Sequence, residues 1–192
     1  TADSLFIAGF TVQQALNTGQ LMEEDVANEF PLKDLRGKID IELLAEFYDV
    51  SEFLMAGFPA AELTPFSLKC ILDAGYDWKE IKNNTDYNAV DFFAAEMKQF
   101  MVNTETGEID LEVWIRDNTG PAATLVSHLR EKACFTVREL PSEIPPKMLH
   151  RAGYSLPEIL KGRSDVHPVI DELVALGFTR LQAVRAGATK YG

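Results

Sequence analysis

The residue types that most often carry catalysis or bind metal are sparse in this chain. The three histidines, His128, His150 and His167, include no pair at i, i+4 spacing, and no H-E-x-x-H motif or Cys/His cluster occurs. Zinc sites depend on such clusters of nitrogen and sulfur ligands. His128 would act as a general base only if the fold placed an acid beside it. We therefore expect the histidines to be hydrogen-bonded or exposed side chains.

The two cysteines, Cys70 and Cys134, stand 64 positions apart and form no C-x-x-C pair. Both have apolar neighbours, and free cysteine is among the most buried residue types. The sequence therefore predicts two buried free thiols.

Other sequence motifs typical of cation sites and enzymes are also absent. A calcium loop aligned on residues 103–110 would place Val102 and Val113 at ligand positions that need carboxylates. No G-x-G-x-x-G, P-loop or G-x-S-x-G motif occurs. The acidic run at residues 23–25 favours a helix N-terminus over a metal site. We expect a protein that is not an enzyme and has no catalytic residues, no metal and no cofactor.

Charge is distributed unevenly along the 192 residues, whose formal net charge is −12. Residues 1–82 carry 15 acidic and 6 basic residues, residues 83–131 carry 9 and 3, and residues 132–192 carry 6 and 9. Nucleic-acid binding needs a positive footprint, so we do not expect a nucleic-acid partner. An acidic front and a basic tail would orient the chain against a partner of complementary charge. Ordinary drift in composition over solvated faces explains the same numbers.

The hydrophobic residues make up 46% of the chain, as in ordinary globular proteins. No apolar run reaches the ~18 residues of a membrane span. We therefore expect a soluble protein, for which peripheral membrane association stays open. Residues 1–20 show no basic segment or long apolar core of a targeting peptide, and the compartment stays open.

A short repeat provides the elements that position these residues. It reads Ala-Gly-aromatic-Ser/Thr/Asp-x-x-Glu/Gln-Leu/Ile, with copies that begin at Ala8, Ala56, Ala74, Ala133, Ala152 and Leu176. The Ala133 copy keeps everything except the glycine, and Pro59 replaces the cap residue of the Ala56 copy. The glycine suits the residue after a helix, where φ is positive, and the aromatic folds back on that helix. The Ser, Thr or Asp then caps the next helix, and the Glu or Gln completes a capping box. The pairs that fit are Thr11/Gln14, Asp77/Glu80, Thr136/Glu139, Ser155/Glu158 and Thr179/Gln182.

The repeat makes a definite structural prediction. Gly57, Gly75, Gly153 and Gly177 should lie at helix C-termini with the following aromatic packed inward. Four aromatic residues at positions 48, 58, 66 and 76 are eight to ten residues apart. This spacing leaves room for helices of only about two turns, which are stable only when stacked on neighbours. We therefore expect an all-α fold, an irregular α-solenoid-like array of short helices.

This repeat resembles the tandem AGF/AGY-S-x-x-E-L helical repeats of uncharacterised microbial and algal proteins. The resemblance covers about half of the chain, in blocks at residues 47–82 and 133–192 with a separate copy at the front. It implies an interaction scaffold and supplies no catalytic residue. It also implies an auxiliary subunit of a large assembly, such as an algal photosynthetic antenna complex in the chloroplast stroma. In that setting apolar side chains would also touch pigment or lipid.

The centre of the chain departs from the repeat. Residues 89–101 have the apolar spacing of a longer amphipathic helix, and residues 103–107 read as a turn. Residues 108–115 fit a short strand or a helix; we favour the helix because residues 107–114 mirror residues 37–44. The mirrored order supports the hypothesis of two duplicated halves. Residues 118–121 break the chain, and the predicted divisions are 1–82, 83–131 and 132–192.

These observations favour a non-catalytic scaffold or linker subunit that binds the protein subunits of a larger complex. Trp78 and Trp114 are expected in the core or in a groove. The candidate partner-binding residues are the basic tail and these two aromatics: Arg151, Lys161, Arg163, Arg180, Arg185, Lys190, Trp78 and Trp114. The alternative is a small-ligand binder or enzyme with a pocket between the two halves, near residues 83–131.

Overall fold

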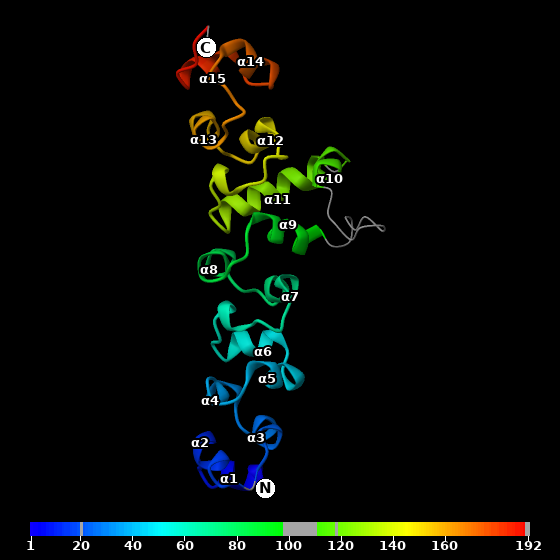
Figure 1. The fold of residues 1–192 in the computed structure, drawn as a ribbon, viewed down its shortest axis with the longest axis vertical. Coiled ribbons are helices and arrows are strands. Elements are labelled where there is room, and N and C mark those ends of the chain that lie inside the picture. The colour runs from blue at the N-terminus through cyan, green and yellow to red at the C-terminus, as the bar shows by residue number, and fades with distance from the viewer. Residues whose placement is uncertain (20, 98–110, 118, 191–192) are drawn as a thin grey trace. The chain divides into compact units, whose positions relative to one another are not determined.

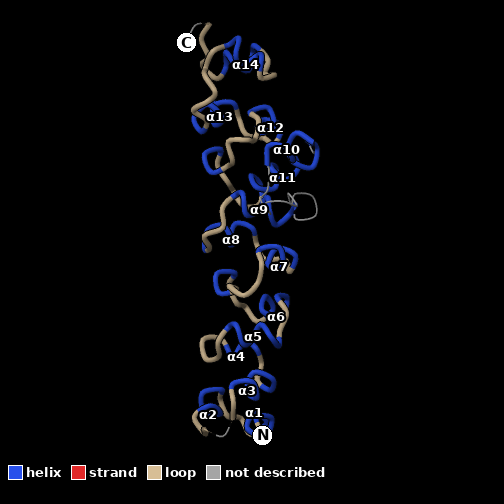
Figure 2. The backbone as a smooth tube through the Cα atoms, turned by 45° about the vertical axis from the view of Figure 1, so that its right-hand side comes forward, coloured by secondary structure: helices blue, strands red, loops and turns tan. Residues whose placement is uncertain are grey.

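The computed structural model describes residues 1–19, 21–97, 111–117 and 119–190. These residues form α-helices and two 3₁₀ helices joined by loops (Figures 1 and 2). Their strand-like pairing is limited to one isolated bridge between Val169 and Thr189. The all-α prediction is therefore confirmed. No helix in the described ranges is long and apolar enough to cross a membrane.

The chain divides into two compact units, residues 1–85 and residues 86–192. Unit 1 contains α1 (Ala2–Ile7), α2 (Val12–Leu16), α3 (Glu23–Glu29), α4 (Leu32–Leu35), α5 (Ile41–Phe47), α6 (Val50–Met55), η1 (Ala60–Glu62), α7 (Leu68–Asp73) and α8 (Trp78–Asn84). Unit 2 contains α9 (Ala89–Met97), α10 (Leu111–Asp117), α11 (Thr119–Glu131), η2 (Val137–Glu139), α12 (Pro146–Arg151), α13 (Leu156–Gly162), α14 (Ile170–Ala175) and α15 (Arg180–Arg185).

Packing within each unit joins elements that are close in sequence. In unit 1, α3 packs on α1, α2 and α5, while α4 packs on α6 and α8 on η1. In unit 2, α11 packs on α9, α10 and α12, and α13 packs on α12 and η2. Helices of four to seven residues are unstable alone, so burial against such neighbours is what maintains them. The boundary between the two units falls at residue 85, so α9 and α11 lie in unit 2.

The predicted helix junctions are present. The φ angles of Gly57, Gly75, Gly153 and Gly177 are 79°, 96°, 97° and 92°. The aromatic residue after each glycine is buried, with at most 4% of its surface exposed. At the first junction the Phe58 N–H donates to Phe53 O and the Gly57 N–H donates to Leu54 O, the two bonds of a Schellman motif. The glycine therefore ends one helix and turns its aromatic neighbour into the core, as predicted.

The junction before Phe135 is built without glycine. Cys134 takes the glycine position, and its φ of 57° is the only positive value of a non-glycine residue in the described chain. The Phe135 N–H closes the turn onto Leu129 O at 3.0 Å. Cys134 faces solvent, as does Cys70 on α7. The prediction of buried thiols is therefore wrong: the residue at this junction position points outward even though both of its neighbours are buried.

Most predicted capping boxes are formed, at Thr11, Thr136, Ser155 and Thr179. A further box at Asp49 with Glu52 was not predicted. The Asp77/Glu80 pair is half formed, because Asp77 accepts from the Glu80 N–H at 2.8 Å. The Glu80 carboxylate instead accepts from the Ala60 N–H at 3.4 Å and so caps η1 in the preceding repeat.

Buried tyrosine hydroxyls connect successive repeats. Tyr76 donates to Phe58 O at 2.9 Å, and Tyr154 donates to Phe135 O at 2.5 Å. These pairs are 18 and 19 residues apart. They occupy matching places in the two halves proposed from the sequence, and each satisfies a carbonyl next to the helix junction.

The central segment is helical where the structure describes it. The predicted helix at 89–101 is present as α9 up to Met97, and the predicted turn at 103–107 lies outside the described residues. Residues 111–115 are helical, as favoured, within α10. Residues 119–121 of the predicted break begin α11, whose first turn includes Pro121, where proline is tolerated, and residue 118 lies outside the described residues.

Candidate functional site

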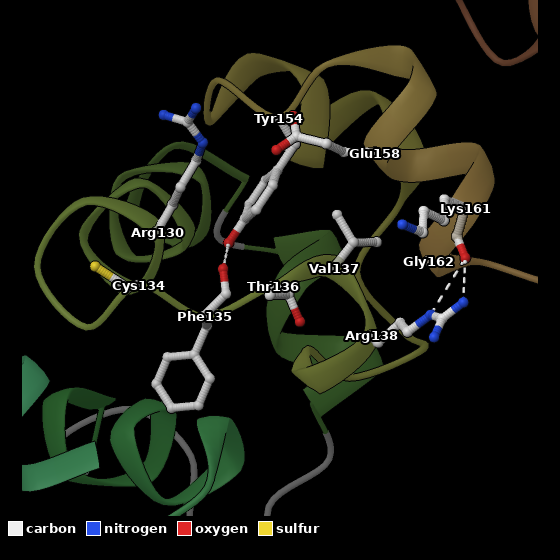
Figure 3. Close-up of a pocket in the computed structure, with 10 residues that line it drawn as sticks. All are labelled: Arg130, Cys134, Phe135, Thr136, Val137, Arg138, Tyr154, Glu158, Lys161 and Gly162. Atoms are coloured by element: carbon white, nitrogen blue, oxygen red, sulfur yellow. Dashed lines mark hydrogen bonds between the residues drawn. The ribbon is translucent and has the colours of Figure 1, made fainter. Parts of the chain in front are cut away.

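A pocket of about 630 Å³ opens within unit 2 between the end of α11, η2 and α13 (Figure 3). We call it the η2 pocket. Its lining combines three basic side chains and one glutamate with apolar, thiol and hydroxyl groups: Arg130, Cys134, Phe135, Thr136, Val137, Arg138, Tyr154, Glu158, Lys161 and Gly162. It is therefore a candidate binding site, built largely from two copies of the repeat.

Close packing between η2 and α13 fixes the floor of the pocket. A β-carbon added to Gly162 would lie 2.6 Å from the Val137 β-carbon, so only glycine allows the end of α13 to approach this closely. Arg138 reaches across the same contact, where its Nε and Nη2 donate to Lys161 O at 3.3 and 3.2 Å. These bonds join the Arg138 side chain to the Lys161 backbone carbonyl (Figure 3).

Tyr154 forms the central wall of the pocket. The Arg130 guanidinium carbon lies 5.3 Å from the centre of the tyrosine ring, a cation–π contact. Burial, the largest cause, raises the Tyr154 pKa well above its usual range. The hydroxyl is therefore a neutral donor to Phe135 O and is not suited to act as a base near neutral pH.

The single carboxylate in the pocket is already occupied. Glu158 accepts from the Ser155 N–H at 2.7 Å and from the Ser155 hydroxyl at 2.6 Å. These bonds lower the Glu158 pKa, so the group is ionised at neutral pH. Within the described part of the chain, no acidic side chain lies within ion-pair distance of Arg130, Arg138 or Lys161. The η2 pocket therefore carries an excess of positive charge.

Of the predicted partner-binding residues, Lys161 lines this pocket and Arg163 does not face solvent. Arg163 is 8% exposed and donates to Ser142 O, Ile144 O and the Asp165 carboxylate. The ion pair with Arg163 lowers the Asp165 pKa. The prediction for Arg163 is therefore corrected: the side chain ties the 142–144 loop to the end of α13 and is not available to a partner.

The two tryptophans differ in exposure. Trp114 is 5% exposed and packs in the core of unit 2, which agrees with the core alternative and removes it from the candidate docking residues. Trp78 is half-buried at the start of α8 in unit 1. Arg151 is exposed at the end of α12, away from the η2 pocket lining.

Three of the predicted residues lie at or after α15. Arg180 and Arg185 are exposed on this helix, and the exposed Lys190 follows it. Leu181 and Val184 lie between the two arginines and are 59% and 54% exposed. Residues three and four apart are neighbours on a helix surface, so Arg180, Leu181, Val184 and Arg185 form one patch, which we call the α15 face.

His150 has a structural role within unit 2. His150 Nδ1 is 3.0 Å from Tyr154 O, and its Nε2 is 2.8 Å from the amide nitrogen of Gln182. Its ring packs against Phe178 at 5.2 Å between ring centres. His150 thereby links α12 to the capping box of α15. Among the described residues, no group of three or more His, Cys, Asp or Glu side chains could hold a metal ion.

Arg130, Arg138 and Cys134 were not predicted as site residues. Arg130 precedes the basic segment at 132–192, and Arg138 lies at an unspecified position of the repeat. A usable signal was the cysteine at the glycine position of that copy, which marks an irregular junction. Comparison with known protein families, curated proteins and solved structures gives no match.

Proposed function

We propose that this chain is a non-catalytic docking or linker subunit that binds a protein partner through the α15 face. The supporting observation is the composition of that face, in which two strongly exposed aliphatic side chains lie between two arginines. Protein interfaces are enriched in arginine, and exposed apolar patches bordered by polar groups are typical docking sites. The role follows from surface composition, not from any reactive group.

The partner surface is expected to be acidic around an apolar centre, because Arg180 and Arg185 border Leu181 and Val184. Arg180 lies 3.6 Å from the Asp171 carboxylate, and both side chains are about 70% exposed. Such an exposed pair contributes little to stability, so the arginine can exchange it for a partner carboxylate at low cost. From the resemblance of the repeats we propose that this docking takes place in a large assembly, specifically an algal photosynthetic antenna complex.

Affinity capture from the source cell with matched variants tests this function. The Leu181→Ser/Val184→Ser variant removes the apolar centre of the α15 face, and Met55→Ser removes an 80% exposed apolar side chain in unit 1 as a control. We expect a stoichiometric set of subunits with the wild type and with Met55→Ser, reduced about tenfold or more with the double variant. Equal recovery with all three proteins, or recovery of no stoichiometric subunit, refutes the proposal.

A further inference from the structure

The η2 pocket contrasts with a matching arrangement in unit 1. There the Arg36 guanidinium lies 5.6 Å from the centre of the Phe58 ring, as Arg130 lies over Tyr154 in unit 2. A glutamate follows each aromatic by four residues, Glu62 in unit 1 and Glu158 in unit 2. The two sites therefore share an arginine, an aromatic ring and a glutamate in the same order.

The glutamates differ in their partners because the capping residues differ. Pro59 caps η1 and has neither an N–H nor a hydroxyl, so Glu62 is available to Arg36 and binds it through both oxygens. Ser155 caps α13 and offers both groups, and Glu158 accepts from each of them. The unit 1 arginine is thereby neutralised within the chain, whereas Arg130 has no carboxylate within ion-pair distance among the described residues.

The cations of the pocket stand at two separate points. Figure 3 shows Arg130 on one side of the Tyr154 ring, and Lys161 and Arg138 on the other side beyond Val137. The two bonds from Arg138 to Lys161 O use Nε and Nη2 and leave Nη1 for another acceptor. A ligand that satisfies both points must carry two anionic groups along an extended body.

From this arrangement we propose that the η2 pocket binds an acidic segment of a partner protein, with one carboxylate at Arg130 and another at Lys161 and Arg138. Carboxylates match the planar donor geometry of guanidinium groups. A pocket of about 630 Å³ accommodates a few residues of peptide in this orientation. Nucleic acid is disfavoured because the whole chain has a net charge of −12. This proposal rests on the proposed docking function in one respect: both require that the binding partner is a protein.

The exposed Cys134 in the pocket lining gives a direct measurement of occupancy. The full chain is mixed with the peptide acetyl-Glu-Asp-Val-Asp-Glu-amide, and iodoacetamide modification of each thiol is followed by mass spectrometry. The exposed Cys70 in unit 1 is the internal control. We expect the peptide to slow modification of Cys134 and leave that of Cys70 unchanged, with protection lost at high salt. The matched peptide with glutamine and asparagine in place of the acids should give no protection.

Substitutions assign the effect to the pocket. Arg130→Gln or Lys161→Gln should weaken peptide binding about tenfold, the effect of losing one charge-assisted contact, while Arg151→Gln outside the pocket should not. Ser155→Pro should weaken binding without removing a cation, because it frees Glu158 to pair with Arg130 as Glu62 pairs with Arg36. The Ser155 φ of −71° is one that proline adopts. Glu158→Gln added to Ser155→Pro should restore binding, and circular dichroism confirms that each variant is folded.

Specific outcomes overturn the proposal. Equal protection of Cys70 and Cys134, or undiminished binding by Arg130→Gln, shows that the peptide does not occupy the η2 pocket. Equal protection by inorganic phosphate at the same concentration refutes the extended two-point ligand. Equal protection by a single-stranded oligonucleotide refutes the acidic peptide as the ligand class. None of these measurements involves the α15 face, so their failure is separate from failure of the proposed docking function.

Discussion

Replacing Cys134 by glycine should stabilise unit 2. Cys134 occupies a junction position that the five other copies of the repeat fill with glycine, and it does so with a φ of 57°. In this left-handed region a β-carbon approaches the following carbonyl oxygen. The substitution removes that strain and leaves the turn onto Leu129 O unchanged, because the turn uses the backbone of Phe135.

The size of the effect follows from two opposing contributions. The left-handed conformation costs an L-residue about 1–2 kcal/mol. Glycine is more flexible in the unfolded chain, which offsets about 0.5–1 kcal/mol of the gain. We therefore expect the free energy of unfolding of unit 2 to rise by about 0.5–1 kcal/mol, or by about 2–5 °C in midpoint temperature for a unit of this size.

The matched control is the same substitution at the other exposed cysteine. Cys70 is the third residue of α7, so Cys70→Gly places glycine inside a helix and should destabilise by roughly 0.3–0.5 kcal/mol. Both variants are unfolded by heat and by urea under reducing conditions, with circular dichroism as the probe. Opposite signs for the two substitutions support the junction reasoning. A Cys134→Gly variant that is no more stable than the wild type refutes it.

Three further changes test other contacts. Arg163→Ala should lower the free energy of unfolding by about 2–4 kcal/mol because buried carbonyls lose a charged donor, whereas the exposed Arg151→Ala should change it by less than about 0.5 kcal/mol. Gly57→Ala should cost about 1 kcal/mol from backbone strain alone, because an added β-carbon at φ 79° meets no atom within 4 Å. Tyr76→Phe should cost about 1 kcal/mol through loss of the bond to Phe58 O. Burial, its main cause, raises the Tyr76 pKa from 10.0 to about 12, so this tyrosine adds stability below pH 10 that is lost as the pH rises through 12.

Urea unfolding followed by circular dichroism measures the effects of the Arg163 and Gly57 substitutions. The same measurement from pH 8 to pH 12 measures the effect of Tyr76→Phe. The Tyr76→Phe variant should show a smaller loss of stability above pH 10 than the wild type. If both proteins lose the same free energy of unfolding above pH 10, Tyr76 has the same pKa in the folded and unfolded states and the reasoning is refuted. Equal effects of the Arg163 and Arg151 substitutions would contradict the buried role of Arg163.

The helix junctions could be predicted from sequence because their chemistry is local. Glycine, aromatic, cap and acid lie within seven residues, and each satisfies a requirement of a helix end. The same local reasoning failed for the cysteines. Cys70 lies on the opposite side of α7 from the buried Leu68 and Ile71, and Cys134 takes a position that points outward. Apolar neighbours therefore say little about a residue at a turn or on a short helix.

The remaining misses depend on contacts between repeats. Arg163 donates to carbonyls 19 and 21 residues earlier, and Glu80 accepts from an N–H 20 residues earlier. No sequence motif predicts which distant backbone carbonyl or N–H group will form a hydrogen bond with these side chains. The excess positive charge of the η2 pocket likewise depends on whether Glu158 binds Ser155 or Arg130. That choice is decided by the folded positions of these side chains, which the sequence does not give. The sequence thus indicated a basic C-terminal surface, but it did not indicate which of the basic side chains there form no ion pair with a carboxylate.

Hydrogen exchange of the captured complex tests the central claim most directly, because it locates the surface covered by the partner. The backbone amides of α14 and α15 should exchange more slowly in the complex than in the isolated chain, while those of α1 to α8 should be unchanged. Slowed exchange confined to unit 1, with α15 unaffected, would contradict docking through the α15 face.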